Sequence, residues 1–298
     1  MENLRGIALM IASMGGFAIE DMFIKLVSAT LPISQILAIL GTGGTLIFGG
    51  LALAKGDRLV EPALFTAPMW LRNLGEMGGT VCFVTAITLI PLAEASAILQ
   101  ATPLAVTLGA AVFLGAPVGW RRWSAILVGF AGVLVVVRPG LDAFQPASLF
   151  AVAAVGGLAT RDLCTRVAPR TVSSRVLSGY GFAMVAVAGL AMMPFGAAPV
   201  MPTGTQVAAL TGALLIGCAA YYAITAAMRI GDVSVITPFR YTRLIFAMIL
   251  GAAVFAEIPD GWTLAGATII IGSGLYTLAR ERRLGRAARP LATPPRAR

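Results

Sequence analysis

The chain has 298 residues, of which 58% are hydrophobic and only 12% are charged, and its formal net charge is +9. Soluble domains contain about 25% charged residues, so this composition excludes an ordinary soluble protein and predicts one surrounded largely by lipid. The sequence has no histidine and three widely separated cysteines, which excludes Ser-His-Asp catalysis, histidine metal sites and CxxC motifs. We therefore expect neither a metal nor a cofactor.

Ten segments are apolar for about 20 residues, the length that an α-helix needs to cross a bilayer. Short turn sequences separate them and leave no room for a soluble domain. Continuous apolar runs of this length also differ from the alternating strands of a membrane barrel. The predicted spans are residues 4–26, 33–54, 67–89, 93–114, 122–138, 147–167, 174–194, 206–228, 233–255 and 262–280.

The positive charges predict the orientation, because cytoplasmic loops carry an excess of Lys and Arg. With a cytoplasmic N-terminus, 16 positive residues lie inside and only Lys25 and Arg138 lie outside. We therefore predict a multi-pass protein of the bacterial inner membrane with both termini in the cytoplasm, which agrees with an even number of spans. Seven of the arginines lie between Arg280, the last residue of the last span, and Arg298, where anionic lipid is a better partner than nucleic acid.

An internal repeat divides the chain. The residues from Gly109 to Trp120 recur from Gly251 to Trp262, 142 residues later, with eight of twelve identical. Each half then contains five spans, and because five is odd the second half enters the membrane from the opposite side. Inverted repeats are characteristic of secondary transporters. The expected units are a first repeat at 1–140, a second repeat at 141–282, and a basic, disordered cytoplasmic tail at 283–298.

Several motifs follow one another in a specific order. The first half contains WLRN at 70–73, PLAEASAILQATP at 91–103, GWRRW at 119–123, GFAGV at 129–133 and VRPG at 137–140, and the second half contains GDVSVITPFRYTRL at 231–244 and EIPD at 257–260. In this order they resemble the drug/metabolite transporter superfamily, specifically its EamA-type ten-helix group, over nearly the whole chain.

The resemblance implies an all-α polytopic membrane protein with ten transmembrane helices, arranged as two inverted five-helix repeats around a central cavity. It also implies a cavity lined by helices 1, 3, 4, 6, 8 and 9, and export of small metabolites, with bacterial amino acid exporters as the most similar members. One position departs from the family. Members usually carry a Glu near position 116, where this chain has Ala116, whereas the second-half counterpart, Glu257, is kept.

Charged residues inside spans point to function, because each costs about 2.5 kcal/mol or more at the centre of an isolated helix and so needs a partner or a wet cavity. Arg243 lies near the middle of the ninth span, and Arg240 lies one turn closer to the cytoplasm on a similar face. Both are candidates for binding a substrate carboxylate. Pro238 loosens this stretch and is a gating candidate. The alternative is that both arginines pair with acids or extend toward the cytoplasmic surface.

Arg72 and Glu76 are four residues apart in the third span and so share a helix face. One interpretation is an ion pair within the helix. The other makes Glu76 a proton carrier or a ligand for a substrate amine, with Arg72 as a coupling candidate. Thr80 is a binding candidate one turn further along.

Four residues in other spans complete the candidate site. Gln100 either lines the cavity or forms a hydrogen bond to a neighbouring helix, and Pro103 is a gating candidate in the same span. Ser13 is a candidate substrate ligand in the first span, where Glu20 is a candidate pathway residue. Tyr222 either belongs to the interfacial aromatic belt or stacks on a substrate.

Two further pairs of neighbouring charges are expected to be structural. Asp21 and Lys25 lie at i and i+4 and are predicted to pair. Arg161 and Asp162 lie toward the cytoplasmic end of the sixth span, where structural pairing is favoured.

The leading hypothesis is a secondary transporter that exports amino acids or related small metabolites across the inner membrane by alternating access. The alternatives are a passive channel or uniporter, and an exporter of other metabolites such as nucleoside-type compounds or drugs. A membrane enzyme is disfavoured, because the chain has no histidine, no metal-binding constellation and no base for a serine nucleophile. The expected partners are a small-molecule substrate and anionic lipid at the basic tail, without nucleic acid. The sequence leaves a homodimer open.

Overall fold

The structure, a computed structural model, describes residues 2–116, 119–141, 143–168, 172–230 and 233–287. Within these ranges the chain forms α-helices and short 3₁₀ helices and no strand. The elements are α1 (Glu2–Ser28), α2 (Ile33–Ala54), η1 (Pro62–Phe65), α3 (Ala67–Leu89), α4 (Leu92–Leu99), α5 (Thr102–Phe113), α6 (Trp120–Val137), α7 (Ser148–Arg166), α8 (Ser174–Met192), η2 (Met193–Phe195), α9 (Gly204–Ile230), α10 (Val233–Ile236), η3 (Thr237–Tyr241), α11 (Thr242–Phe255) and α12 (Gly261–Ala287).

These elements reproduce the ten predicted spans. The fourth span is divided into α4 and α5, and the ninth into α10, η3 and α11. Eight of the described spans are long and apolar enough to cross a membrane. The other two, α3 and α7, are less apolar because they carry charged residues that pair with each other, as described below. Helix α12 continues to Ala287, so it includes 283–287 from the expected tail, and residues 288–298 lie outside the described part.

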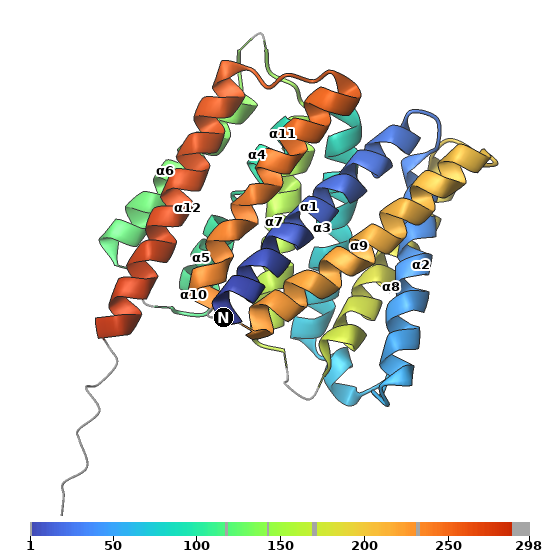
Figure 1. Cartoon of the computed structure of the whole chain (residues 1–298), viewed down its shortest axis with the longest axis horizontal. Coiled ribbons are helices and arrows are strands. Elements are labelled where there is room, and N and C mark those ends of the chain that lie inside the picture. The colour runs from blue at the N-terminus through green and yellow to red at the C-terminus, as the bar shows by residue number, and fades with distance from the viewer. Residues whose placement is uncertain (1, 117–118, 142, 169–171, 231–232, 288–298) are drawn as a thin grey trace, which may run out of the picture.

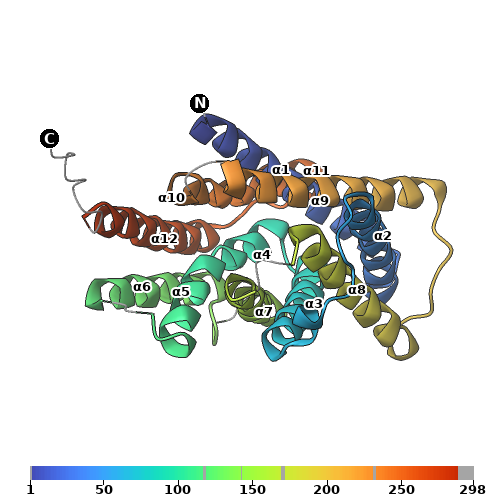
Figure 2. The same cartoon turned by 90° about the horizontal axis from the view of Figure 1, so that it is seen from below.

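The helices form two layers (Figure 2). Helices α12, α10–α11, α1 and α9 make one layer, and α6, α5, α7, α3 and α8 make the other, with α4 between them and α2 at one end. Within the layers α1 packs on α9 and α3 packs on α7, and between them α2 packs on α8 and α6 packs on α12. When each helix is replaced by its counterpart in the other five-helix half, the α1–α9 contact becomes the α7–α3 contact. The α2–α8 and α6–α12 contacts are unchanged by this exchange. The packing therefore confirms two inverted five-helix repeats.

Glycines at equivalent positions allow two close helix crossings, as small residues do in membranes. A Cβ added to Gly157 of α7 would lie 2.6 Å from the backbone nitrogen of Gly79 in α3. A Cβ added to Gly16 of α1 would lie 2.9 Å from the Cβ of Ala220 in α9. Gly157 follows Gly16 by 141 residues, and Ala220 follows Gly79 by the same number. The two crossings therefore define the register of the repeat in α1, α3, α7 and α9.

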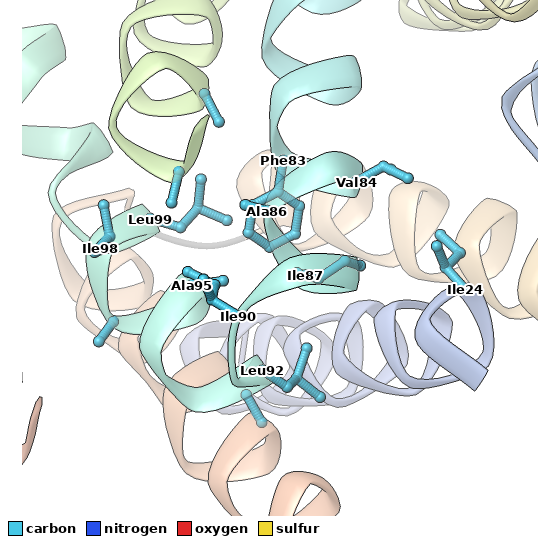
Figure 3. Close-up of a cluster of buried hydrophobic side chains, with 14 of the residues drawn as sticks. Ile24, Phe83, Val84, Ala86, Ile87, Ile90, Leu92, Ala95, Ile98 and Leu99 are labelled. Atoms are coloured by element: carbon cyan, nitrogen blue, oxygen red, sulfur yellow. The ribbon is translucent and has the colours of Figure 1, made fainter. Parts of the chain in front are cut away.

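The two faces of the protein differ in how apolar side chains are buried. We call the face at which α1 begins and α12 ends the N-terminal face, and the other the opposite face (Figure 1). The largest apolar cluster lies toward the opposite face. It includes Ile24 of α1, Phe83 and Ile87 of α3, Leu92 of α4 and Ala247 of α11, and Figure 3 shows the α3–α4 part of it. Because α1, α3, α4 and α11 all contribute, the cluster fills the space between the layers in that half.

Candidate functional site

The interrupted spans bring their breaks together at the centre of the molecule. Helix α4 ends at Leu99 and α5 begins at Thr102, whereas η3 ends at Tyr241 and α11 follows directly. Pro103 is in the first turn of α5 and Pro238 in the first turn of η3, where a missing backbone N–H is tolerated.

Gln100 connects the two breaks. Its Nε2 donates to the backbone oxygen of Tyr241 at 3.2 Å and to that of Arg240 at 3.5 Å. These carbonyl groups lie at the end of η3, where the regular helix is interrupted, so the amide joins the end of α4 to the break in the ninth span. The hydrogen-bonding interpretation of Gln100 is therefore the one that the structure shows.

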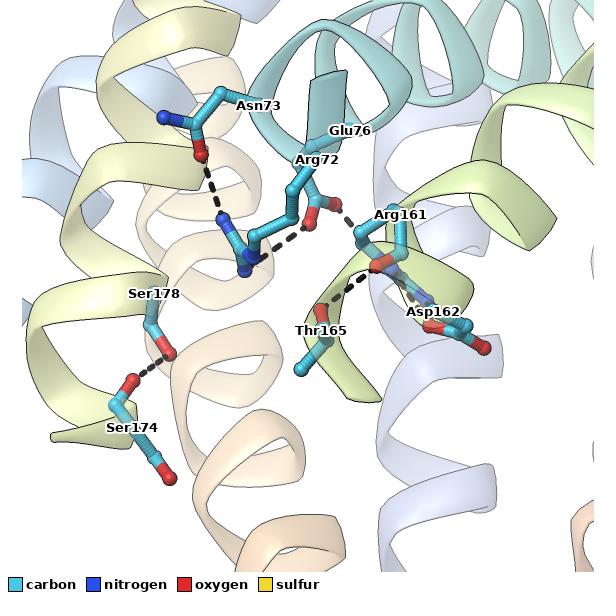
Figure 4. Close-up of polar contacts among 8 residues, drawn as sticks. All are labelled: Arg72, Asn73, Glu76, Arg161, Asp162, Thr165, Ser174 and Ser178. Carbon is cyan, nitrogen blue, oxygen red and sulfur yellow. Dashed lines mark hydrogen bonds and ion pairs between the residues drawn. The ribbon is translucent and has the colours of Figure 1, made fainter. Parts of the chain in front are cut away.

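An ion network connects α3 to α7 (Figure 4). Glu76 Oε1 lies 3.1 Å from Nη1 of Arg161, whereas Glu76 Oε2 lies 3.8 Å from Nη2 of Arg72. The predicted pair within α3 is thus present, but the shorter contact runs between helices. Arg72 is buried, with 2% of its surface exposed, and its Nη1 donates to Oδ1 of Asn73 at 2.8 Å.

The network continues across the molecule through Asp162. Its Oδ1 accepts from Arg161 Nη2 at 2.8 Å, which confirms the predicted pair. On the other side, Asp162 Oδ2 lies 4.0 Å from Nη2 of Arg240 in η3. Sequence reasoning missed this chain of charges, because its members come from three spans that only the fold brings together.

Arg243 has a different environment from Arg240. Its Nη2 lies 2.7 Å from Oδ2 of Asp21 in α1, and its guanidinium carbon lies 5.3 Å from the ring centroid of Phe17 and 5.2 Å from that of Phe83. The predicted Asp21–Lys25 pair is therefore wrong. Asp21 binds Arg243 across the helix interface, because a neighbouring span supplies a closer partner than the next turn of α1.

Lys25 instead belongs to a polar cluster at the opposite face. Its Nζ lies 2.6 Å from Glu257 Oε1 and donates to the backbone oxygen of Ile90 at 2.7 Å. The backbone N–H of Leu92 donates to Glu257 Oε2 at 2.9 Å. One feature of the sequence pointed to a special role for Lys25: it is one of only two positive residues predicted to lie outside. The other, Arg138, lies 2.6 Å from Asp260.

A cavity of about 150 Å³ lies between the layers toward the N-terminal face. Six of its lining residues come from four different elements: Pro103, Thr107, Asp162, Thr237, Arg240 and Thr277. The Arg240 side chain is 31% exposed, so its guanidinium is accessible there. The cavity therefore offers a cation and an anion from opposite layers.

The remaining predicted residues lie elsewhere. Ser13 is fully buried and its Oγ donates to the backbone oxygen of Ala220 at 2.7 Å, which joins α1 to α9. Thr80 is half-buried on α3. Tyr222 is 68% exposed, as expected of a belt residue, whereas its neighbour Tyr221 packs on Phe48 with ring centroids 5.7 Å apart.

Glu20 lies against α9. A Cβ added to Gly217 would lie 2.5 Å from Glu20 Oε1, so the carboxylate occupies the space that a side chain would need. No ion pair involves Glu20 in the part of the chain that the structure describes. Within that part, no group of three His, Cys, Asp or Glu side chains is placed to hold a metal ion.

The fold and the site define a multi-pass membrane transporter with two inverted repeats. The chain belongs to the EamA-like transporter family, which matches it twice, over residues 4–138 and 145–279. It is 26% identical over 213 residues to an S-adenosylmethionine uptake transporter of Rickettsia felis, covering 72% of each chain. It is 30% identical over 206 residues to a riboflavin transporter of Vibrio cholerae, covering 68% of each.

Two further proteins share most of their length with this chain. A pseudopaline exporter of Pseudomonas aeruginosa is 29% identical over 272 residues, which are 89% of this chain and 93% of that protein. A solved crystal structure that is 24% identical superposes with a TM-score of 0.61 over 92% of this chain and 98% of that one, and it shows the same fold. The chain is therefore a transporter of small metabolites and not an enzyme.

Proposed function

We propose that this protein is a secondary transporter that exports amino acids or related small metabolites across the bacterial inner membrane by alternating access. The observation that carries the proposal is the pairing of Arg240 and Asp162 on two sides of the cavity. Arg240 Nη2 and Asp162 Oδ2 are 4.0 Å apart, which is too far for a hydrogen bond. A zwitterion inserted there would place its carboxylate on Arg240 and its amine on Asp162.

The relatives support a substrate of this class without identifying it. The names of two of them, S-adenosylmethionine and pseudopaline transporters, include one importer and one exporter. For this chain, the proposed direction is export. Its cavity lies toward the N-terminal face, which we propose is cytoplasmic from the distribution of Lys and Arg. The large apolar cluster fills the other half, so the described conformation is the one that loads substrate from the cytoplasm.

We further propose that Glu20 is the residue through which proton binding drives transport. Glu76 is neutralised by Arg161 at 3.1 Å, whereas Glu20 lies against Gly217 without an ion pair in the described structure. Its charged neighbours are Asp21 and Arg243, and these two already pair with each other. A carboxylate inside a span that has no ion-pair partner is a candidate for the proton pathway.

The remaining parts of the proposal concern organisation. The first repeat spans 1–140 and the second 141–282, and the basic segment after α12 contacts anionic lipid. A homodimer stays an alternative to a monomer. Within the proposed site, Thr107 and Thr277 supply polar groups next to Arg240, whereas Tyr222 faces away from the interior and Ser13 joins two helices.

The experiment that tests the function is counterflow with the purified full chain in liposomes, using a panel of amino acids and nucleoside-type metabolites. A transporter of the proposed class shows saturable counterflow that depends on the α-carboxylate and α-amine. Arg240→Gln reduces it, and the exposed Tyr222→Phe serves as the matched control. Linear, non-saturable flux would identify a channel, and the absence of flux for every amino acid would contradict the proposal.

A further inference from the structure

The polar cluster at the opposite face joins the two layers, which matters for the alternating access proposed above. Lys25 of α1 and Glu257 after α11 belong to one layer, and they are 2.6 Å apart. Both also bind the turn between α3 and α4 in the other layer, Lys25 through the oxygen of Ile90 at 2.7 Å and Glu257 through the N–H of Leu92 at 2.9 Å. We call these two side chains the Lys25–Glu257 latch.

The backbone after α11 has an equivalent after α5. Ala256 has φ +54° and Gly115 has φ +62°, so both adopt the left-handed conformation. The next residue in each case donates its N–H to the carbonyl six residues earlier at 3.0 Å, Glu257 to Gly251 and Ala116 to Ala110. The sequence repeat alone, with its offset of 142, aligns Glu257 with Gly115. The backbone geometry aligns Glu257 with Ala116 instead.

Lys25 also has an equivalent position. The register set by the helix crossings, 141 residues, places Arg166 at the end of α7 where Lys25 lies near the end of α1. By sequence this position carries a cation, so a counterpart latch would need an acid beside it. The position of the acid is taken by Ala116, which has no side-chain acceptor.

We infer that Lys25 and Glu257 are the gating residues that hold the opposite face closed, and that Ala116 leaves the N-terminal face without the equivalent latch. The inference rests on the proposed alternating access. A charged, hydrogen-bonded pair that also binds the α3–α4 turn favours the conformation in which that face is closed, and among the described residues Ala116 cannot form its counterpart. The cavity near Arg240 and the apolar cluster at the other end agree with this bias.

The test measures conformation rather than transport. Spin labels are attached at Ala29→Cys in one layer and Leu89→Cys in the other, on the full chain with Cys82, Cys164 and Cys218 replaced, and the distance distribution is recorded in lipid without substrate. Glu257→Gln removes the charge at constant size. It is expected to raise the ratio of the longer to the shorter distance by roughly tenfold, in line with the loss of a charge-assisted hydrogen bond.

Ala116→Glu adds the missing acid and is expected to shift the distribution in the same direction, whereas Ala116→Gln is the matched control and shifts it much less. The double variant Lys25→Gln with Glu257→Gln is expected to shift it no further than either single change. An unchanged distribution in Glu257→Gln would overturn the role of the latch. Equal effects of Ala116→Glu and Ala116→Gln would overturn the inference that the N-terminal face lacks only the acid of an equivalent latch.

These outcomes are separable from the proposed function. A chain that shows the expected distances but no counterflow refutes transport of the tested metabolites and keeps the latch. A chain with saturable counterflow and unchanged distances keeps the function and refutes the latch.

Discussion

The halves of the molecule toward its two faces share one backbone plan and differ in their side chains. Toward the opposite face the space between the layers is filled by a large apolar cluster and joined by the Lys25–Glu257 latch. Toward the N-terminal face, the described residues form two smaller apolar clusters, and Arg240 and Asp162 border a cavity. An inverted repeat relates the two ends in backbone, so we attribute the difference between them to side-chain substitutions.

The same contrast appears at one pair of equivalent helix contacts. Glu76 of α3 meets Arg161 of α7 at 3.1 Å. The residues 141 positions away from that pair are Gly217 of α9 and Glu20 of α1, which also touch each other. One contact is an ion pair, and the other is a carboxylate against a glycine. The repeat thus preserves the place of a contact while its chemistry diverges.

The largest expected effect comes from breaking the pair at the centre. Asp21→Asn leaves the partly buried Arg243 without its counterion, which should reduce the free energy of unfolding by about 3 kcal/mol, the lower end of the range for a buried pair. Thermal unfolding in detergent measures the loss. Replacing both residues, Asp21→Leu with Arg243→Met, should restore most of it. A double variant as unstable as the single one would show that the pair is not what stabilises this region.

Removing a buried side chain from the apolar cluster should also lower the free energy of unfolding. Ile87 is fully buried in the apolar cluster, so Ile87→Ala is expected to remove about 2–5 kcal/mol by lost burial and a cavity. Leu74 lies on the same helix with 47% of its surface exposed, and Leu74→Ala is the control. Equal losses in the two variants would contradict a closed apolar half.

The two arginines of the ninth span should separate stability from binding. Arg240→Gln is expected to weaken substrate binding at least tenfold, about 1.4 kcal/mol, with little change in unfolding. Arg243→Gln is expected to lower stability because it leaves Asp21 unpaired. Equilibrium binding and thermal unfolding of both variants check the distinction. If Arg243→Gln alone abolished binding in a folded protein, the proposed site would be misplaced.

The smallest effect concerns a loop at the N-terminal face. Hydrogen bonds from Arg175 and Ser173 lower the pKa of the Asp57 carboxyl below its ordinary value. Its contribution to stability is therefore present above the unfolded pKa, near 4, and is lost as the pH falls through the lower folded value. The melting temperature should fall more between pH 5 and pH 3 in the wild type than in Asp57→Asn. Identical pH profiles would contradict the assignment.

The sequence predicts the fold well because its signals are local. Apolar length identifies each span, and the repeat beginning at Gly109 requires the inversion. The site is harder, because its contacts join distant spans. Helical spacing favours partners four residues apart, such as Lys25 for Asp21. It indicates neither the Asp21–Arg243 pair nor the Glu76–Arg161 pair.

Broken helices are a second source of difference. The 3₁₀ geometry of η3 directs Arg240 to Asp162, whereas Arg243 in α11 turns to Asp21. Sequence spacing placed the two arginines on a similar face. The interruption after Pro238 separates their partners, and no regular helical pattern contains that information.

The central claim is that one end is open to solvent and the other is closed. It is tested most directly with a membrane-impermeant thiol reagent applied to each side of oriented vesicles, in a background without native cysteines. The account predicts that Thr107→Cys, in the cavity, reacts from the N-terminal face only, and that Ala95→Cys, in the apolar cluster, reacts from neither. Reaction of Thr107→Cys from the opposite face in the absence of substrate would contradict it.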